Sequence, residues 1–345
     1  MRRGRATAVV LALVTLLGAC GGASTTAPGN GRDAVALRFL SRYALPDGRV
    51  VRRDQGGDTV SEGQAYGMLI AAAIGDRSAF TRIWRWTKGQ LERPDGLFAW
   101  HWTGGRVVDP QAASDADLEI ARALLVAGCR FGDASLQRRG VAVGRAVLAR
   151  ETAQRGRRLV LAAGPWATGN PITVNPSYLD PALLDALARL TGDRRFGDLA
   201  GGTAAAIAAV SDPLPPDWAT IDEQGAVTPS GPPGRRVPAT YGFDAPRAVV
   251  WAAVAPRAAG RRLAARAWPA LRGRATTEPL AAVAAAAAAA AAGDRSARDR
   301  LLARADRLQA GAPTYYGTAW AALGRLLLTS DRLSICSSPD HRSTT

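Results

Sequence analysis

Apolar residues recur at helical spacing along almost the whole chain. Between Asp33 and Thr329, Ala, Leu and Arg dominate, and β-branched residues almost never alternate with a period of two. This pattern predicts many helices and few strands. Dividing the chain at Gly, Pro and capping residues predicts twelve helices, over 33–44, 62–75, 77–91, 115–130, 134–150, 177–190, 194–210, 244–255, 258–271, 277–292, 295–309 and 314–329.

The predicted helices alternate in character. Odd-numbered ones, such as 134–150, carry one charged face, as helices in contact with solvent do. Even-numbered ones, such as 62–75, 277–292 and 314–329, are apolar nearly all round, which is typical of helices buried on every side. The sequence therefore predicts an all-α fold, an (α/α)6 barrel of six inner and six outer helices.

The alanine run over 284–292 also fits a membrane segment or a low-complexity region. The predicted helix around it has sixteen residues, fewer than the roughly 20 that span a bilayer. Alanine is the strongest helix former, and its small side chain lets neighbouring backbones approach closely. We therefore assign the run to the inner ring.

The N-terminus has the features of an export signal. Arginines at positions 2, 3 and 5 precede an apolar run over 8–17 that is too short for a transmembrane helix. The sequence LGAC at 17–20 is similar to a bacterial lipobox, in which the cysteine, here Cys20, is lipidated. The alternative is an ordinary signal peptide with a chance cysteine.

These features predict an exported protein, anchored by lipid outside the cytoplasmic membrane. The predicted parts are a signal peptide over 1–19, a flexible polar tether over 20–32, one folded domain over 33–330 and a C-terminal tail over 331–345.

The formal net charge of +15 comes almost entirely from arginine. Because the arginines are spread along many segments, without aromatic residues between them on one face, the charge does not predict a nucleic-acid-binding protein. We interpret it as a solvated surface, with attraction to anionic envelope polymers as the alternative.

Cysteine and histidine are too few for a disulfide framework or a metal motif. Besides Cys20, only Cys129 and Cys336 are present, and a bridge between them is possible without being supported by the sequence. With two histidines and no ligand-like spacing, no metal is predicted. The sequence also has no glycine-rich loop of the kind that binds phosphate. For the oligomeric state, a monomer is the default expectation.

Candidate chemistry lies where the even-numbered helices begin. In a barrel of this kind their N-termini open at one end, and polar residues stand at four of these starts, Glu62, Asp115, Tyr178 and Asp244. Acids in a first helical turn are also favoured by the helix dipole. Four polar residues on one end of an apolar ring exceed what capping needs, so we predict a functional site there.

Helix capping is the alternative for the first two starts. Ser61 with Gln64, and Ser114 with Asp117, each have the spacing of a capping box. For Asp117 this structural role is the first interpretation.

Aromatic residues gather in the same connections, and sugar rings stack on such faces, which predicts a sugar-binding cleft. They are Trp100, Trp102, Trp166, Trp218, Tyr315 and Tyr316. Core packing is the alternative. Core packing and sugar binding both stay open for the tryptophans inside predicted helices, which are Trp84, Trp86, Trp251, Trp268 and Trp320.

Three segments carry a family resemblance. They are SEGQAYGM at 61–68, ASDAD at 113–117 followed by the signature spacing to position 131, and NPSY at 175–178. Together they resemble glycoside hydrolase family 8, bacterial endoglucanases that include the cellulase encoded with cellulose synthase. The resemblance extends over about 38–328, with weaker similarity at 216–218 and 244–247.

The resemblance implies an (α/α)6 barrel without a cofactor that cleaves internal β-1,4 bonds of a cellulose-type polysaccharide with inversion. It implies that Glu62 is the general acid, that Asp244 is the base that activates water, and that Asp115 is catalytic by binding and distorting the sugar. Predicted substrate-binding residues are Tyr66, Trp100, Trp102, Asp117, Tyr178, Trp218, Arg247 and Tyr315.

An inverting pair must stand about 6.5 to 9.5 Å apart, and its acid must keep a proton near neutral pH. The helix dipole works against this at Glu62 by about 0.3 to 1 kcal/mol. We predict that desolvation and the charge of Asp115 outweigh the dipole.

Two positions depart from the family pattern. Its members usually carry an aromatic residue where this chain has Glu119, and a tyrosine where it has Phe243. Substrate alternatives are therefore chitosan, xylan and mixed-linkage glucan, although the arginine excess argues against a polycationic substrate. A lipoprotein that binds polysaccharide without cutting it is the other alternative, and the presence of all three acids argues against it.

Overall fold

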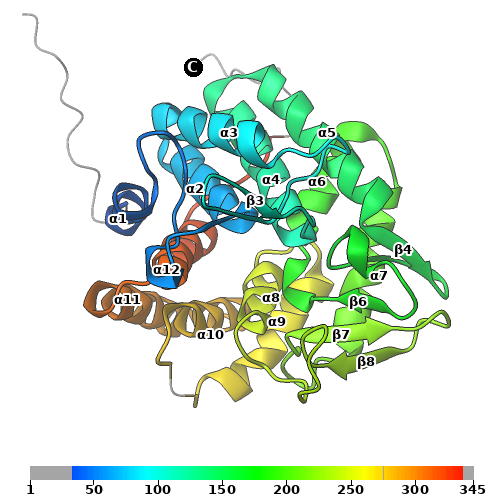
Figure 1. Ribbon diagram of the computed structural model, residues 1–345. Coiled ribbons are helices and arrows are strands. Elements are labelled where there is room, and N and C mark those ends of the chain that lie inside the picture. Colours follow the sequence, from blue (N-terminus) through cyan, green and yellow to red (C-terminus); the bar gives the residue numbers. More distant parts are fainter. Residues whose placement is uncertain (1–32, 275, 337–345) are drawn as a thin grey trace, which may run out of the picture.

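The inner ring consists of six helices that pack in sequence around a closed barrel (Figure 1). A computed structural model describes residues 33–274 and 276–336. Contacts link the inner helices around the ring, and the last returns to the first; between the second and the third, the 3-10 turn Pro176–Tyr178 packs on the second helix. The inner helices are α2 (Ser61–Ile74), α4 (Ser114–Phe131), α6 (Pro181–Thr191), α8 (Ala245–Ala253), α10 (Pro279–Ala291) and α12 (Tyr315–Thr329).

Six outer helices cover this ring. Each packs on the inner helices next to it: α3 on α2, α5 on α4, α7 on α6, α9 on α8 and α10, α11 on α10 and α12, and α1 on α12 and α2. The (α/α)6 prediction is confirmed. The outer helices are α1 (Ala34–Tyr43), α3 (Arg77–Leu91), α5 (Ala134–Arg150), α7 (Arg195–Ala209), α9 (Ala258–Leu271) and α11 (Arg295–Gly311).

The alanine run lies in the inner ring, as predicted. Residues 284–289 of α10 are fully buried or nearly so. A Cβ atom added at Gly324 of α12 would stand 2.3 Å from Cγ1 of Val283, so the Val283 side chain of α10 packs on a position of α12 that has no side chain. Among the described residues no helix is long and apolar enough to cross a membrane.

Short antiparallel strands lie in the connections that lead into α2, α4, α6 and α8. They form two three-stranded sheets and one hairpin. The strands are β1 (Thr59–Val60), β2 (His101–Thr103), β3 (Arg106–Asp109), β4 (Thr152–Arg155), β5 (Arg158–Leu161), β6 (Ile172–Val174), β7 (Trp218–Ile221) and β8 (Val227–Ser230).

Four inner helices, α6, α8, α10 and α12, begin one to four residues later than predicted, and α6 differs most. Tyr178 lies in a 3-10 turn (Pro176–Tyr178), and α6 starts only at Pro181, where the side chain of Asp180 accepts a hydrogen bond from the Leu183 amide. A proline at the first helical position and an acidic N-cap define this later start. Asp244 is likewise the residue before α8.

The capping-box interpretation is wrong at both starts. Ser61 and Ser114 are the first residues of α2 and α4, with Val60 and Ala113 at the N-cap positions. The third-position side chains make tertiary contacts instead. The Gln64 side chain accepts a hydrogen bond from the backbone N–H of Val50 and donates one to Thr87. The Asp117 side chain accepts a hydrogen bond from the backbone N–H of Phe98 at 2.9 Å.

The chain beyond α12 is fastened to the barrel. Cys336 forms a disulfide with Cys129, which answers the question that the sequence left open. Leu333 is buried, and its carbonyl oxygen accepts a hydrogen bond from Nη2 of Arg122 at 3.1 Å. The predicted tail thus packs on the domain as far as it is described. The predicted signal peptide, Cys20, the tether up to position 32 and positions 337–345 lie outside the described residues.

Candidate active site

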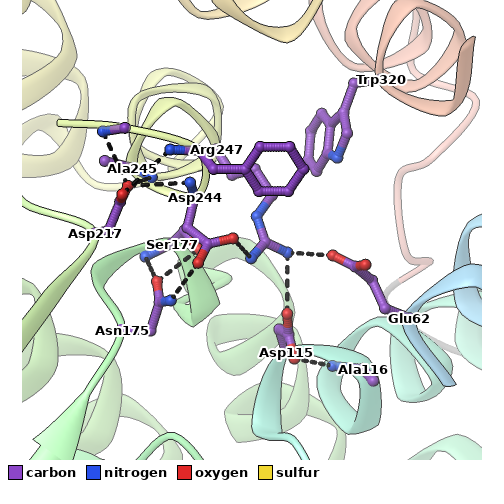
Figure 2. Close-up of polar contacts among 12 residues, drawn as sticks. Glu62, Asp115, Ala116, Asn175, Ser177, Asp217, Asp244, Ala245, Arg247 and Trp320 are labelled. Carbon is purple, nitrogen blue, oxygen red and sulfur yellow. Dashed lines mark hydrogen bonds and ion pairs between the residues drawn. The ribbon is translucent and has the colours of Figure 1, made fainter. Parts of the chain in front are cut away.

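Arg247 stands at the centre of three carboxylates (Figure 2). Its Nη1 lies 2.6 Å from Oε1 of Glu62 and 3.0 Å from Oδ2 of Asp115, and its Nη2 lies 2.9 Å from Oδ1 of Asp244. The three acids begin or precede α2, α4 and α8, so the barrel brings them together at one end, as the sequence predicted. The Arg247 side chain is only 2% exposed. It therefore lies beneath the carboxylates and holds them, although the sequence predicted it to bind substrate.

Glu62 is held on its other side by the inner ring. Tyr66, one turn further along α2, donates its hydroxyl to Oε1 of Glu62 at 2.6 Å, and Trp320 of α12 donates its indole N–H to that hydroxyl at 3.0 Å. Burial raises the pKa of Glu62 to about 7; the charge of Arg247 opposes this shift and that of Asp115 adds to it. Glu62 is therefore protonated up to neutral pH, in the direction that the sequence predicted.

Asp115 lies deeper than Glu62. Its side chain is 6% exposed, and Oδ1 accepts the backbone N–H of Ala116 at 2.8 Å. Burial raises the pKa of Asp115, while the charge of Arg247 and its hydrogen bond lower it. The buried Asp115 and the partly exposed Glu62 thus share Nη1 of one arginine.

Asp244 is positioned by residues that the sequence did not single out as functional. Its Oδ2 accepts a hydrogen bond from Nδ2 of Asn175 at 3.1 Å. The carboxylate of Asp217 accepts hydrogen bonds from four consecutive backbone N–H groups, at positions 242 to 245, at 2.7 to 3.2 Å. Asp217 therefore fixes the turn that carries Asp244 (Figure 2). The available signal was an acid beside Trp218 in the loop before α8.

Tyr178 and Trp218 lie beside the acidic centre. The guanidinium carbon of Arg247 is 5.4 Å from the ring centre of Tyr178. The Trp218 ring meets Tyr178 edge-on at 6.0 Å. Trp100 is partly exposed, and its carbonyl oxygen accepts the amide of Ser61, the residue before Glu62.

The other predicted binding residues are buried or turned to the outer layer. Tyr66, Asp117 and Tyr315 are at most 1% exposed, so they support the site from below. Trp102 packs edge-on against Trp86 of α3, with the two ring centres 5.3 Å apart. The structure does not bring these four side chains to the open surface of the site.

Two further aromatic side chains in the connections between helices are exposed. Trp166 is 43% exposed and Phe243 is 63% exposed. Phe243, the neighbour of Asp244, stacks nearly parallel on Tyr316 with ring centres 4.5 Å apart. Over 33–274 and 276–336, no group of three or more His, Cys, Asp or Glu side chains is arranged to hold a metal ion.

The fold and the site together define an (α/α)6-barrel enzyme with a protonated acid facing carboxylates across one end of the barrel. The family model for glycosyl hydrolases family 8 matches residues 14–330. The chain therefore belongs to glycosyl hydrolase family 8.

Relatives of known name agree with this membership. The chain is 36% identical over 230 residues to a probable endoglucanase of Novacetimonas hansenii, covering 62% of this chain and 66% of the relative. It is 28% identical over 219 residues to an endoglucanase of Cellulomonas uda, covering 61% of this chain and 60% of the relative. The matched part thus spans less than two thirds of the length of these curated relatives.

A solved endo-β-1,4-glucanase from Acetobacter xylinum is similar over 86% of this chain and 98% of its own, with a TM-score of 0.69 and 28% identity. A β-1,3-1,4-glucanase from Paenibacillus has a TM-score of 0.76 at 18% identity, over 86% of this chain and 90% of its own. At that identity the likeness concerns the fold alone.

The raised pKa of Glu62 predicts the upper limit of the pH range of activity. A general acid must be protonated, so kcat/KM should fall as the pH rises through about 7. The measurement is kcat/KM between pH 4 and 9 at constant ionic strength.

The Tyr66→Phe variant identifies the group responsible for this limb. The Tyr66 hydroxyl stabilises the charged form of Glu62, so its removal should raise the pKa of Glu62 and move the basic limb to higher pH. A basic limb that stays in place in this variant would assign it to another group.

Proposed function

We propose that this protein is an endo-β-1,4-glucanase that cleaves internal bonds of a cellulose-type polysaccharide with inversion at the anomeric carbon. The observation that carries the proposal is the placement of Glu62 and Asp244 on the two terminal nitrogens of one guanidinium. Because that group is small and rigid, the two bound oxygens are at most about 8 Å apart. This upper bound is compatible with the roughly 6.5 to 9.5 Å of an inverting pair, which leaves room for one water molecule.

In this mechanism Glu62 gives its proton to the glycosidic oxygen as the bond to the leaving sugar breaks. Asp244 accepts a proton from a water molecule whose oxygen attacks the anomeric carbon from the opposite face. Arg247 holds the Asp244 carboxylate in place for this step through the contact of its Nη2 with Oδ1. The products are two shorter chains, one with an inverted reducing end.

Asp115 has a different part in the proposal. It shares Nη1 of Arg247 with Glu62, and its charge helps Glu62 to keep its proton. From that position its carboxylate would accept a hydrogen bond from a hydroxyl of the sugar at the cleavage point. That contact would favour a distorted sugar ring. We assign it this binding role and no covalent step.

The substrate assignment rests on the relatives and on the aromatic surface. The relatives reported above include named endoglucanases. Trp100, Trp166, Trp218 and Phe243 offer exposed or partly exposed ring faces for glucose units. The excess of arginine disfavours a polycationic substrate such as chitosan.

Export and anchoring extend the proposal. The disulfide between Cys129 and Cys336 is typical of proteins that fold outside the cytoplasm, which supports the predicted export signal. Lipid attachment at Cys20 and a monomeric state are proposed on the sequence alone.

The test is to incubate the purified protein with carboxymethylcellulose, lichenan, xylan and chitosan. We expect the viscosity of carboxymethylcellulose to fall well before the reducing ends approach completion, because internal bonds are cut. Proton NMR of cellopentaose cleavage should show the α-anomer first, as inversion requires. Cleavage of xylan or chitosan alone would overturn the substrate assignment, and an initial β-anomer would overturn the mechanism.

A further inference from the structure

A fourth acid, which the mechanism above does not use, lies inside the barrel. Glu119 is on α4, one helical turn after Asp115, and is 2% exposed. Its Oε2 atom has no hydrogen-bond partner in the described part of the chain. The two buried arginines of the interior are engaged elsewhere, Arg247 with the three site carboxylates and Arg122 with Asp180. Glu119 is therefore a buried carboxyl group without a cation.

A carboxyl group in these surroundings is neutral. An ionised carboxylate without a counterion is far more costly to bury than a carboxylic acid. Burial, and then the charges of Asp115 and Glu62, raise the pKa of Glu119 well above its usual value. The groups around it are Glu62 and Tyr66 on α2, Asp115 on its own helix, Asp180 before α6, Arg247 on α8, and Tyr315 and Tyr316 on α12. A neutral acid carries an O–H that needs an acceptor.

The helix directs this O–H toward Asp115. Side chains four residues apart share one face of a helix, and each leans toward the N-terminal end. The charge of Asp115 also acts on Glu119 more strongly than that of Glu62. Each Asp115 oxygen already accepts one hydrogen bond, from Ala116 or from Arg247, and has a second lone pair free for another donor.

Glu62 and Asp115 need such a device because both share one nitrogen of Arg247, so the proton could reside on either. For hydrolysis the proton must reside on Glu62 and the charge on Asp115. We propose that Glu119 is a positioning residue that donates its O–H to the Asp115 carboxylate through one water molecule, and so leaves the catalytic proton on Glu62. This inference rests on the proposed function for its kinetic consequence.

The kinetic test compares two neutral replacements of similar length. Glu119→Gln keeps a donor, and Glu119→Met has none. Losing a donor to a carboxylate destabilises the charged form, so the pKa of Asp115 should rise in Glu119→Met. We expect the acidic limb of kcat/KM to move up by about one pH unit in Glu119→Met, because a hydrogen bond to a charged group contributes about that much. Glu119→Gln should restore the wild-type limb.

A second measurement does not depend on activity or on the stability of the Met variant. In wild-type protein labelled with 13C at its carboxyl groups, the Glu119 resonance, assigned by its loss in Glu119→Gln, should show the protonated form from pH 5 to 8. Titration of Glu119 within or below this range would overturn the inference, as would equal acidic limbs in the Gln and Met variants. If the wild type cuts no glucan, the proposed function fails, and the carboxyl titration still decides the role of Glu119.

Discussion

Replacing Glu62 by Gln should lower kcat/KM on carboxymethylcellulose by about 10²- to 10⁴-fold, the usual contribution of general acid catalysis. The amide cannot protonate the glycosidic oxygen, whereas its size and its contact with Tyr66 are retained. Because Arg247 stays paired with Asp115 and Asp244, the variant should fold. Initial rates and thermal melting curves of the two proteins provide the measurement.

A substrate with an acidic leaving group separates loss of the acid from general damage. In a dinitrophenyl β-cellobioside the leaving group is dinitrophenolate, which departs without protonation. The rate of its hydrolysis by Glu62→Gln should therefore fall far less than the rate on the polysaccharide. Glu92→Gln, which makes the same chemical change in an outer ion pair with Arg139, should keep wild-type rates. Equal losses on both substrates, or more than a tenth of the activity left on carboxymethylcellulose, would contradict the role of Glu62.

The fold was predictable because the spacing of apolar residues along the chain indicates which faces of each helix are buried. A helix that is apolar all round, such as α10 with its alanines, has no face for water, and six such helices in alternation with amphipathic ones leave few arrangements. The helix starts were less predictable. Asp180 and Pro181 define the start of α6, yet the apolar pattern alone predicted a start four residues earlier.

The site was predictable as a set of acids and not as a network. Glu62, Asp115 and Asp244 were found because three inner helices begin near them. The role of Arg247 as their common partner depends on contacts between residues separated by up to 185 positions, which no local pattern encodes. The same holds for Asn175 and Asp217, which orient Asp244 across 69 and 27 positions.

Local patterns also produced the wrong roles. Ser61 with Gln64, and Ser114 with Asp117, have the spacing of capping boxes. The side chains of Gln64 and Asp117 instead accept hydrogen bonds from backbone N–H groups outside their own helices. A buried amide or carboxyl group takes the partner that the packed interior offers, and an unsatisfied partner there costs about 1 to 3 kcal/mol. Tyr66 and Tyr315, which were predicted to bind sugar, are a separate case: the structure places both in the packed layer beneath the acids.

The largest effect on stability is expected for Arg247→Met. Arg247 is the cation that three partly or fully buried carboxylates share, and its removal leaves their charges uncompensated. Breaking a buried ion pair on one side costs about 3 to 5 kcal/mol, so we expect a loss of this size in the free energy of unfolding at pH 7.5. Urea denaturation followed by circular dichroism measures it.

The pH dependence of this loss distinguishes charge from packing. Arg247 lowers the pKa of both Glu62 and Asp115, so without it their pKa values in the folded state rise further above those of the unfolded chain. The folded variant then binds more protons than the unfolded chain, and its stability falls as pH rises through the interval between the two sets of pKa values. The deficit relative to the wild type should therefore be small at pH 4 and largest above pH 7.

Two further variants make this interpretation decisive. Adding Asp115→Asn to Arg247→Met removes one of the uncompensated charges and should recover part of the lost stability. Arg195→Met, which breaks the exposed pair with Asp193, should leave the stability close to that of the wild type. A deficit in Arg247→Met that is the same at pH 4 and pH 7.5, and unchanged by Asp115→Asn, would mean that the arginine stabilises the barrel by filling space, and the three carboxylates would then have to be held apart by their own hydrogen bonds.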